Sequence, residues 1–142
     1  MAQAIEFANI TTMYEEDLEF TEGGADTLYT TQLGVSMSDV FSLYAKVSDG
    51  DAKVTISFEV ATKKKPVDDP DPTVSDWCVG DTDGDDVLFK DFDYTNWIPT
   101  DLHPVLAFFI RLKITRQEDS IKAFSINTRI MKQKKMPTTS RY

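Results

Sequence analysis

Residues 105–132 read VLAFFIRLKITRQEDSIKAFSINTRIMK, and this stretch decides the fold class of the chain. Apolar and polar side chains alternate on both sides of the polar turn 117–120. The apolar positions are Phe108, Ile110, Leu112 and Ile114 before the turn, and Phe124, Ile126 and Ile130 after it. A period of two places one face on a core and the other in water, which is typical of antiparallel β-structure. The stretch therefore predicts a long β-hairpin.

The same alternation recurs toward the N-terminus. Residues 41–47 and 54–60 alternate cleanly, and the Asp49-Gly50 pair between them predicts a second hairpin, because glycine accepts the positive φ of tight hairpin turns. Shorter strands are predicted at 5–10, 18–20, 27–35, 77–79 and from Val87 onward, with an acidic turn at 15–17 and an aromatic, proline-containing connection over 94–104.

About eight short strands without a clear helix predict a single all-β domain, an antiparallel β-sandwich. Jelly-roll and immunoglobulin-like topologies fit the pattern equally well. The 142-residue chain has the length of one domain. We assign the sandwich to residues 1–131 and a basic C-terminal arm to residues 132–142.

Charge is divided unevenly along the chain, whose net charge is -9. Residues 1–115 hold 22 acidic and 8 basic side chains, whereas residues 116–142 hold 2 acidic and 7 basic ones. An acidic body disfavours nucleic acid as a partner, because phosphate binding needs positive charge. The basic arm is suited to an acidic neighbour, including another copy of the chain, although a merely solvated tail is the alternative. The candidate contact residues in the arm are Lys132, Lys134, Lys135, Arg141 and Tyr142.

Residue types that support catalysis are scarce. Cys78 is the single cysteine and His103 the single histidine, so neither a disulfide within the chain nor a cysteine-based zinc cluster can form. Nothing around Cys78 activates it for a nucleophilic pair with His103. The chain also lacks a Gly-x-Ser-x-Gly elbow and a glycine-rich phosphate loop. We therefore predict a protein that is not an enzyme and holds no cofactor.

Two features favour a ligand-binding alternative. Asp81, Asp83 and Asp85 match the first three ligand positions of an EF-hand calcium loop, but Asp86 replaces the turn glycine and Phe92 the final glutamate. An acidic solvated turn is the favoured interpretation, and a looser calcium site the alternative. Exposed aromatic rings stack on sugars in carbohydrate-binding sandwiches, and Trp77, Tyr94 and Trp97 could form such a platform. A core or loop-packing role is the favoured interpretation, because aromatic residues dominate cores.

The order of these segments resembles that of small virion proteins of tailed bacteriophages. The resemblance spans about residues 38–132 and rests on four phrases: FSLYAKVSDG with AKVTISFEV, the Trp-bearing SDW, LAFFIRLKIT, and the closing IKAFSIN. It implies a β-sandwich that serves as a capsid decoration, auxiliary or minor head or tail protein. The insertion at 63–74 and the extension at 132–142 depart from the family pattern.

These observations predict a non-enzymatic structural protein of a phage virion. We expect it to bind other virion proteins, such as the major capsid protein, or copies of itself as a homo-oligomer. The arm is the first candidate contact region and the 63–74 loop the second. The N-terminus lacks signal-peptide features, and no apolar run has the length of a membrane span, so we expect synthesis in the host cytoplasm, no membrane association and a final location in the virion. The alternative is a carbohydrate- or receptor-binding sandwich.

Overall fold

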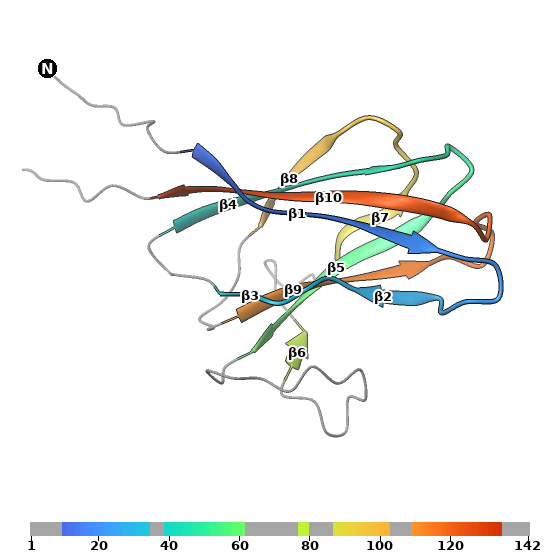
Figure 1. Ribbon diagram of the computed structural model, residues 1–142, viewed down its shortest axis with the longest axis horizontal. Coiled ribbons are helices and arrows are strands. Elements are labelled where there is room, and N and C mark those ends of the chain that lie inside the picture. Colours follow the sequence, from blue (N-terminus) through green and yellow to red (C-terminus); the bar gives the residue numbers. More distant parts are fainter. Residues whose placement is uncertain (1–9, 35–38, 62–76, 80–86, 103–108, 135–142) are drawn as a thin grey trace, which may run out of the picture.

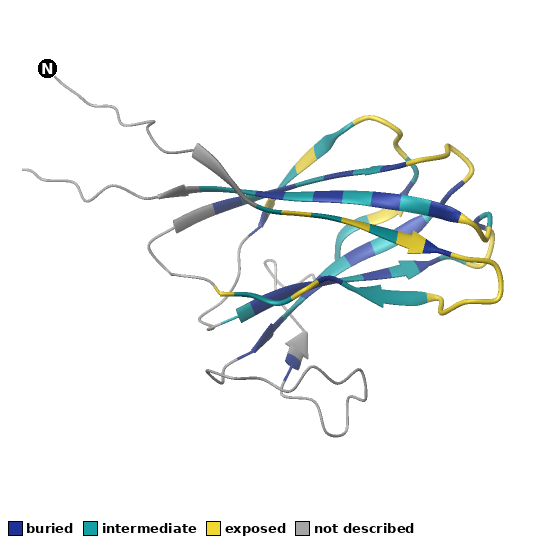
Figure 2. Ribbon diagram, viewed as in Figure 1, coloured by how far each residue is buried: buried dark blue, intermediate teal, exposed yellow. Residues whose placement is uncertain are grey.

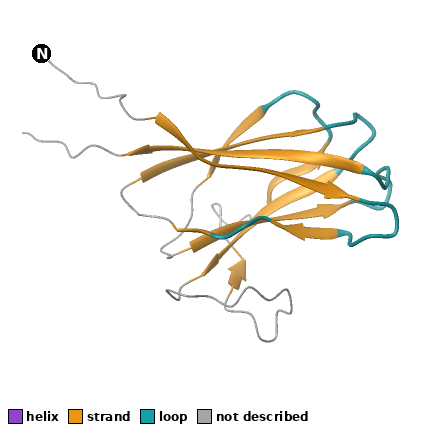
Figure 3. Cartoon of the chain, in the orientation of Figure 1, coloured by secondary structure: helices purple, strands orange, loops and turns teal. Residues whose placement is uncertain are grey.

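The computed structural model describes residues 10–34, 39–61, 77–79, 87–102 and 109–134, which form ten β-strands and no helix (Figures 1 and 3). The strands are β1 (Ile10–Phe20), β2 (Thr27–Tyr29), β3 (Leu33–Gly34), β4 (Asp39–Val47), β5 (Val54–Ala61), β6 (Trp77–Val79), β7 (Val87–Phe92), β8 (Ile98–Leu102), β9 (Phe109–Arg116) and β10 (Phe124–Lys134). None of the described residues belongs to a helix of the length and apolarity that crossing a membrane requires.

The strands form two antiparallel sheets that pack face to face, which confirms the predicted β-sandwich. Sheet A has the order β1-β10-β4-β8, and sheet B the order β2-β9-β5-β6, with β3 also on β9 and β7 also on β5. The pairs β1–β10, β2–β9, β4–β8 and β5–β7 are nested from the ends of the chain inward. A long hairpin rolled into two sheets produces this order, so the topology is that of a jelly roll rather than an immunoglobulin domain.

The core lies between the sheets and is built by the alternation read from the sequence. On β5 every second residue is buried from Val54 to Val60 (Figure 2). β4 and β10 follow the same rule, as does β9 apart from Arg111, which is also buried. Residues with no exposed surface include Leu43, Ile56, Phe58, Ile110, Leu112, Ile114 and Ile126. Burying each such side chain stabilises the fold by roughly 1.5–3 kcal/mol before the cost of ordering the chain.

Both predicted hairpins are wrong, although their strands exist. β9 lies in sheet B and β10 in sheet A, and β4 and β5 are divided in the same way. Each connection therefore forms an arch between sheets, and the real partners are β4 with β10 and β5 with β9. Gly50 does not adopt a positive φ. Instead, Asp49 accepts hydrogen bonds from the backbone N–H groups of Asp51 (Oδ1, 2.9 Å) and Ala52 (carbonyl, 3.0 Å), which turns the chain across the sandwich.

The predicted acidic turn at 15–17 is also wrong, because β1 runs without a break from Ile10 to Phe20. Its register with β10 shifts once, between Thr12 and Tyr14. Phe20 reaches the core, Glu15, Asp17 and Glu19 are exposed, and Glu16, on the same face as Phe20, is half-buried. Thr128 of β10 is fully buried and donates a hydrogen bond from Oγ1 to the Glu16 carbonyl at 2.9 Å. Pairing with β10 along the whole strand outweighs the low β-propensity of Glu and Asp.

Three other boundaries differ from the sequence predictions. The strand expected over 27–35 is two short strands, β2 and β3, and the connection expected over 94–104 contains β8. β10 continues to Lys134, because it pairs with β1 as far as Gln133 and with β4 as far as Lys134. The sheet thus extends three residues into the segment assigned to the arm.

Candidate interaction surface

Four connections cross between the sheets at one end of the sandwich, which we call the arch end (Figure 1). They are residues 21–26 (β1 to β2), 117–123 (β9 to β10), 48–53 (β4 to β5) and 93–97 (β7 to β8). The strands that these loops join have the same order in both sheets. The four loops therefore lie side by side in the order just given. β10 ends, and β1 begins, at the opposite end of the sandwich.

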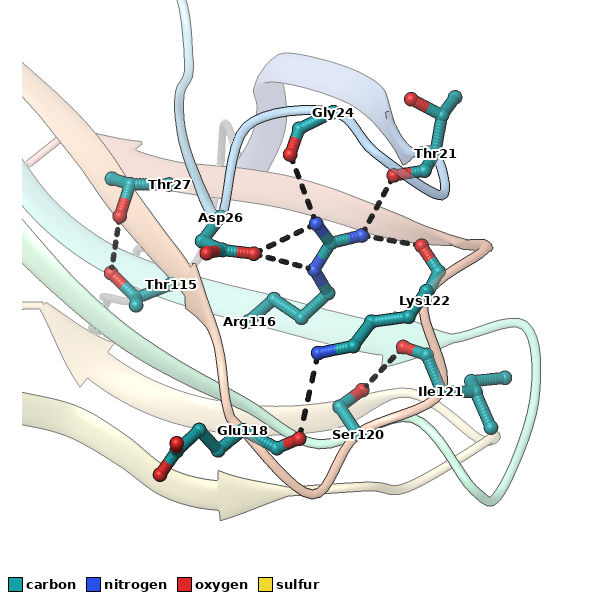
Figure 4. A network of polar contacts seen from close by, with 10 residues as sticks. All are labelled: Thr21, Gly24, Asp26, Thr27, Thr115, Arg116, Glu118, Ser120, Ile121 and Lys122. Carbon is teal, nitrogen blue, oxygen red and sulfur yellow. Dashed lines mark hydrogen bonds and ion pairs between the residues drawn. The ribbon is translucent and has the colours of Figure 1, made fainter.

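Arg116, the last residue of β9, ties two of these loops together (Figure 4). Its side chain is 2% exposed, and its guanidinium donates to the carbonyls of Thr21 (2.9 Å), Gly24 (3.2 Å) and Lys122. It also forms a forked pair with Asp26 Oδ1, through Nε at 3.1 Å and Nη2 at 2.8 Å. A buried guanidinium is stable only with such a set of acceptors, so this geometry fixes the loops relative to each other.

The two central loops, 48–53 and 117–123, are bound to each other directly. Lys53 donates its backbone N–H to Ser120 Oγ at 2.9 Å and accepts from the Gln117 N–H at 2.9 Å. The Ile121 N–H donates to the Asp51 carbonyl at 3.2 Å. At the surface, Lys53 Nζ lies 3.0 Å from Asp119 Oδ2. Backbone groups that a hairpin would pair within one sheet are satisfied here between neighbouring loops.

Ion pairing at the arch end shifts three pKa values. The hydrogen bond from Arg116, followed by its charge, holds the pKa of Asp26 below its usual value. The hydrogen bond from Lys53 lowers the pKa of Asp119, and the reciprocal contact raises the pKa of Lys53. All three groups are exposed and open to screening by salt. The shifts therefore report local ion pairing between neighbouring loops.

On the outer face of sheet A, one aromatic ring lies beside two cations. The Trp97 ring centroid is 4.8 Å from Lys46 Nζ and 4.5 Å from the guanidinium carbon of Arg129. Arg129 also pairs with Glu15 of β1, at 3.1 Å between Nη2 and Oε2. The contacts join β1, β10, β4 and the connection before β8 across the face through cation–π and ionic attraction.

On the outer face of sheet B, Arg111 forms a second cluster. Its side chain is 3% exposed, and its guanidinium carbon lies 4.2 Å from the Tyr29 ring centroid and 4.4 Å from that of Trp77. Glu59 accepts from Arg111 Nε at 2.9 Å, with Nη2 at 2.8 Å from the same oxygen. Sequence reasoning missed this cluster because a single Arg on a polar strand face gives no signal of burial.

The alternative of an aromatic platform is not supported, and the favoured core role is confirmed for Trp77. Trp77 is 8% exposed and lies on β6 of sheet B, whereas Trp97 stands directly before β8 of sheet A. Tyr94 is the one large hydrophobic residue classed as exposed in the described part of the chain, at 55%, and its ring packs edge-on against Phe92 at 5.5 Å. Only Tyr94 and Trp97, three residues apart in one connection, remain as a pair.

The structure places two of the five predicted contact residues. Lys132 and Lys134 belong to β10, and Lys132, which follows the buried Ile130 by two positions, is half-buried on the core side of sheet A. They are therefore strand residues and not part of a separate arm. Lys135, Arg141 and Tyr142 lie outside the described residues.

Further predicted sites also fall outside the described residues, namely Asp81, Asp83 and Asp85, the 63–74 loop, and His103. Among the side chains that the structure does describe, no group of three or more His, Cys, Asp or Glu residues has a metal-binding arrangement.

Comparison of the chain with protein-family models, with curated proteins and with solved structures finds no match. The structure defines the class of the protein as an all-β jelly-roll sandwich, with loops at the arch end that are joined by hydrogen bonds and ion pairs.

Proposed function

We propose that this chain is a non-enzymatic structural subunit of a phage virion, a capsid decoration, auxiliary or minor head or tail protein. The observation that carries the proposal is the jelly-roll strand order, an architecture that recurs in viral capsid domains. The resemblance of residues 38–132 to small phage virion proteins supports it. Fold-level analogy alone does not fix function, so the virion assignment rests on both together.

The placement of the basic C-terminal region fits a subunit that contacts neighbours. β10 lies between β1 and β4 in sheet A and leaves the sheet at the end opposite the arches. Lys134 and Lys135 follow one another at this exit, and Arg141 and Tyr142 complete the segment. A basic segment that follows directly on a strand of sheet A suits binding to acidic surfaces of other virion proteins or of further copies.

A carbohydrate- or receptor-binding module is the second candidate, favoured by the exposed ring of Tyr94 and the nearby Trp97. Aromatic rings with a free face stack on sugars, and Tyr94 meets this condition better than Trp97, whose ring already contacts Lys46 and Arg129. A glycan-binding screen with wild type and Tyr94→Ala tests this candidate. Glycan binding by wild type that is lost in the variant would favour this function over the structural one.

Particle composition tests the structural proposal directly. The tagged chain is produced together with the other structural proteins encoded beside it, and particles are separated on a density gradient. We expect the chain in the particle fraction at a fixed ratio to the major capsid protein. A chain found only in the soluble fraction would contradict the proposal.

A further inference from the structure

β1 is the one long strand whose outer edge is open in the described part of the fold. It spans 11 residues and pairs with β10 alone. The other described edges are each blunted: β8 carries Pro99, β2, β3 and β6 have two or three residues, and the register of β7 on β5 shifts near Asp91, whose φ is 55°. Natural sheets protect edges with short strands, prolines and bulges, and an unprotected long edge is a template for another strand.

Carboxylates mark the exposed face of this edge strand. Glu15, Asp17 and Glu19 alternate along β1 and are exposed. Glu15 pairs with Arg129, whereas Asp17 and Glu19 lie opposite the uncharged Asn127 and Ser125. Within the described residues, no cationic side chain pairs with Asp17 or Glu19. An added strand would therefore meet unpaired backbone groups together with uncompensated negative charge.

This charge disfavours pairing of β1 with its own counterpart in a second copy. An antiparallel pair centred on Asp17 would place Asp17 opposite Asp17 and Glu15 opposite Glu19. Like charges directly opposite each other destabilise a sheet. Pairing between the β1 strands of two copies is therefore disfavoured, whereas this edge can pair with a basic strand.

We propose that the outer edge of β1 binds the C-terminal segment 135–142 of a second copy as an added β-strand; this inference rests on the proposed function as a self-assembling subunit. The segment, KMPTTSRY, contains two cations and no acidic side chain. Its Pro137 lacks an N–H and fits an added strand only with that side turned away from β1, as in other edge strands. In an extended chain Lys135 and Arg141 share one face, because side chains alternate with a period of two. That face can be set beside the exposed face of β1. Six positions separate the two cations and two separate Asp17 from Glu19, so one cation lies opposite one of these carboxylates in a given register.

Length and position favour a second copy over the segment's own chain. Eight extended residues span about 26 Å at ~3.3 Å each, enough to follow Tyr14 to Phe20. In its own chain the segment leaves β10 on the inner side of β1, and reaching the outer edge means crossing two strand spacings of about 4.8 Å. The crossing would use about three residues, including Lys135, and would remove that cation from the acidic face.

Charge reversal on both sides of the contact tests the proposal in the full-length chain. The edge variant is Asp17→Lys with Glu19→Lys, the segment variant is Lys135→Glu with Arg141→Glu, and the restoring variant combines all four. The matched control, Asp51→Lys with Glu118→Lys, makes the same charge change at the exposed arch end. Association is followed by sedimentation velocity at low and high salt, and amide hydrogen exchange reports on Tyr14 to Phe20.

We expect the edge and segment variants each to weaken self-association by roughly tenfold or more, and the combined variant to restore it. The control should associate like wild type. Amide exchange over Tyr14 to Phe20 should slow on association in wild type, in the restoring variant and in the control, but not in the edge or segment variants. Association lost in the control and kept in the edge variant would overturn the proposal in favour of docking at the arch end. If wild type and all variants are monomeric, the proposal is also overturned. The proposed function would still hold in that case if the chain is found in the particle fraction.

Discussion

The guanidinium of Arg116 lies 2.8 Å from the carboxylate of Asp26, and this pair joins the end of β9 to the loop between β1 and β2. The arginine is 2% exposed and the aspartate 71% exposed, so the two partners contribute differently. The buried cation depends on its acceptors, whereas Asp26 is hydrated without it.

Replacing Arg116 by Met should lower the free energy of unfolding by about 2–4 kcal/mol, because the carbonyls of Thr21, Gly24 and Lys122 lose their donor. Arg116→Lys should have a free energy of unfolding between those of wild type and the Met variant, since an ammonium group cannot reach all the acceptors of the planar guanidinium. Urea unfolding monitored by tryptophan fluorescence measures both. A Met variant as stable as wild type would show that the network contributes nothing.

Acidification should remove the contribution of Asp26. Its pKa is lower in the folded state than in the unfolded chain, where it is about 3.9. The stabilisation is therefore fully present above the unfolded value and is lost as pH falls through the folded value. We expect Asp26→Asn to be less stable than wild type at pH 6 and equal to it at the acidic limit. In an Arg116→Met background, which already lacks the ion pair, Asp26→Asn should show no such pH-dependent gap.

Glu59→Ala should cost about 2–4 kcal/mol of unfolding free energy, because it takes the carboxylate from the buried Arg111. The double replacement of Arg111 by Met and Glu59 by Ala should cost less than the sum of Arg111→Met and Glu59→Ala alone, since it removes both charges together. A double-mutant cycle by chemical denaturation gives the coupling energy. Strict additivity would mean that the pair is not coupled.

Paired cysteines distinguish the observed arches from hairpins. Lys46 and Asn127 are direct partners on β4 and β10, so cysteines at both positions should form a disulfide under mild oxidation. Lys113 and Asn127 lie on the outer faces of opposite sheets, about 10 Å or more apart, and cysteines there should stay reduced. Both variants carry Cys78→Ala, and non-reducing gels with mass spectrometry read the result. A disulfide formed by the second pair alone would show that β9 and β10 form a hairpin.

Much of the fold follows from local pattern. The alternation in 41–47, 54–60 and 109–130 specifies strands and the face that each one buries, and residues such as Ile56, Leu112 and Ile126 lie in the core as that pattern predicts. The candidate surface was less accessible to sequence reasoning. Glu15, Glu16 and Asp17 of β1 looked like a turn, because Glu and Asp have low β-propensity and the strand that pairs with β1 is more than 100 residues distant in sequence.

The sequence by itself determined that this chain is a β-sandwich and which residues its core contains, because burial of one strand face depends only on side-chain periodicity. The tertiary structure alone decided which strands pair. A hairpin and an arch carry the same alternation, since both join antiparallel strands that turn the same side chains toward one core. Their difference lies in where the polar groups of the connection find partners, and here Arg116, Ser120 and Lys53 supply those partners from loops distant in sequence.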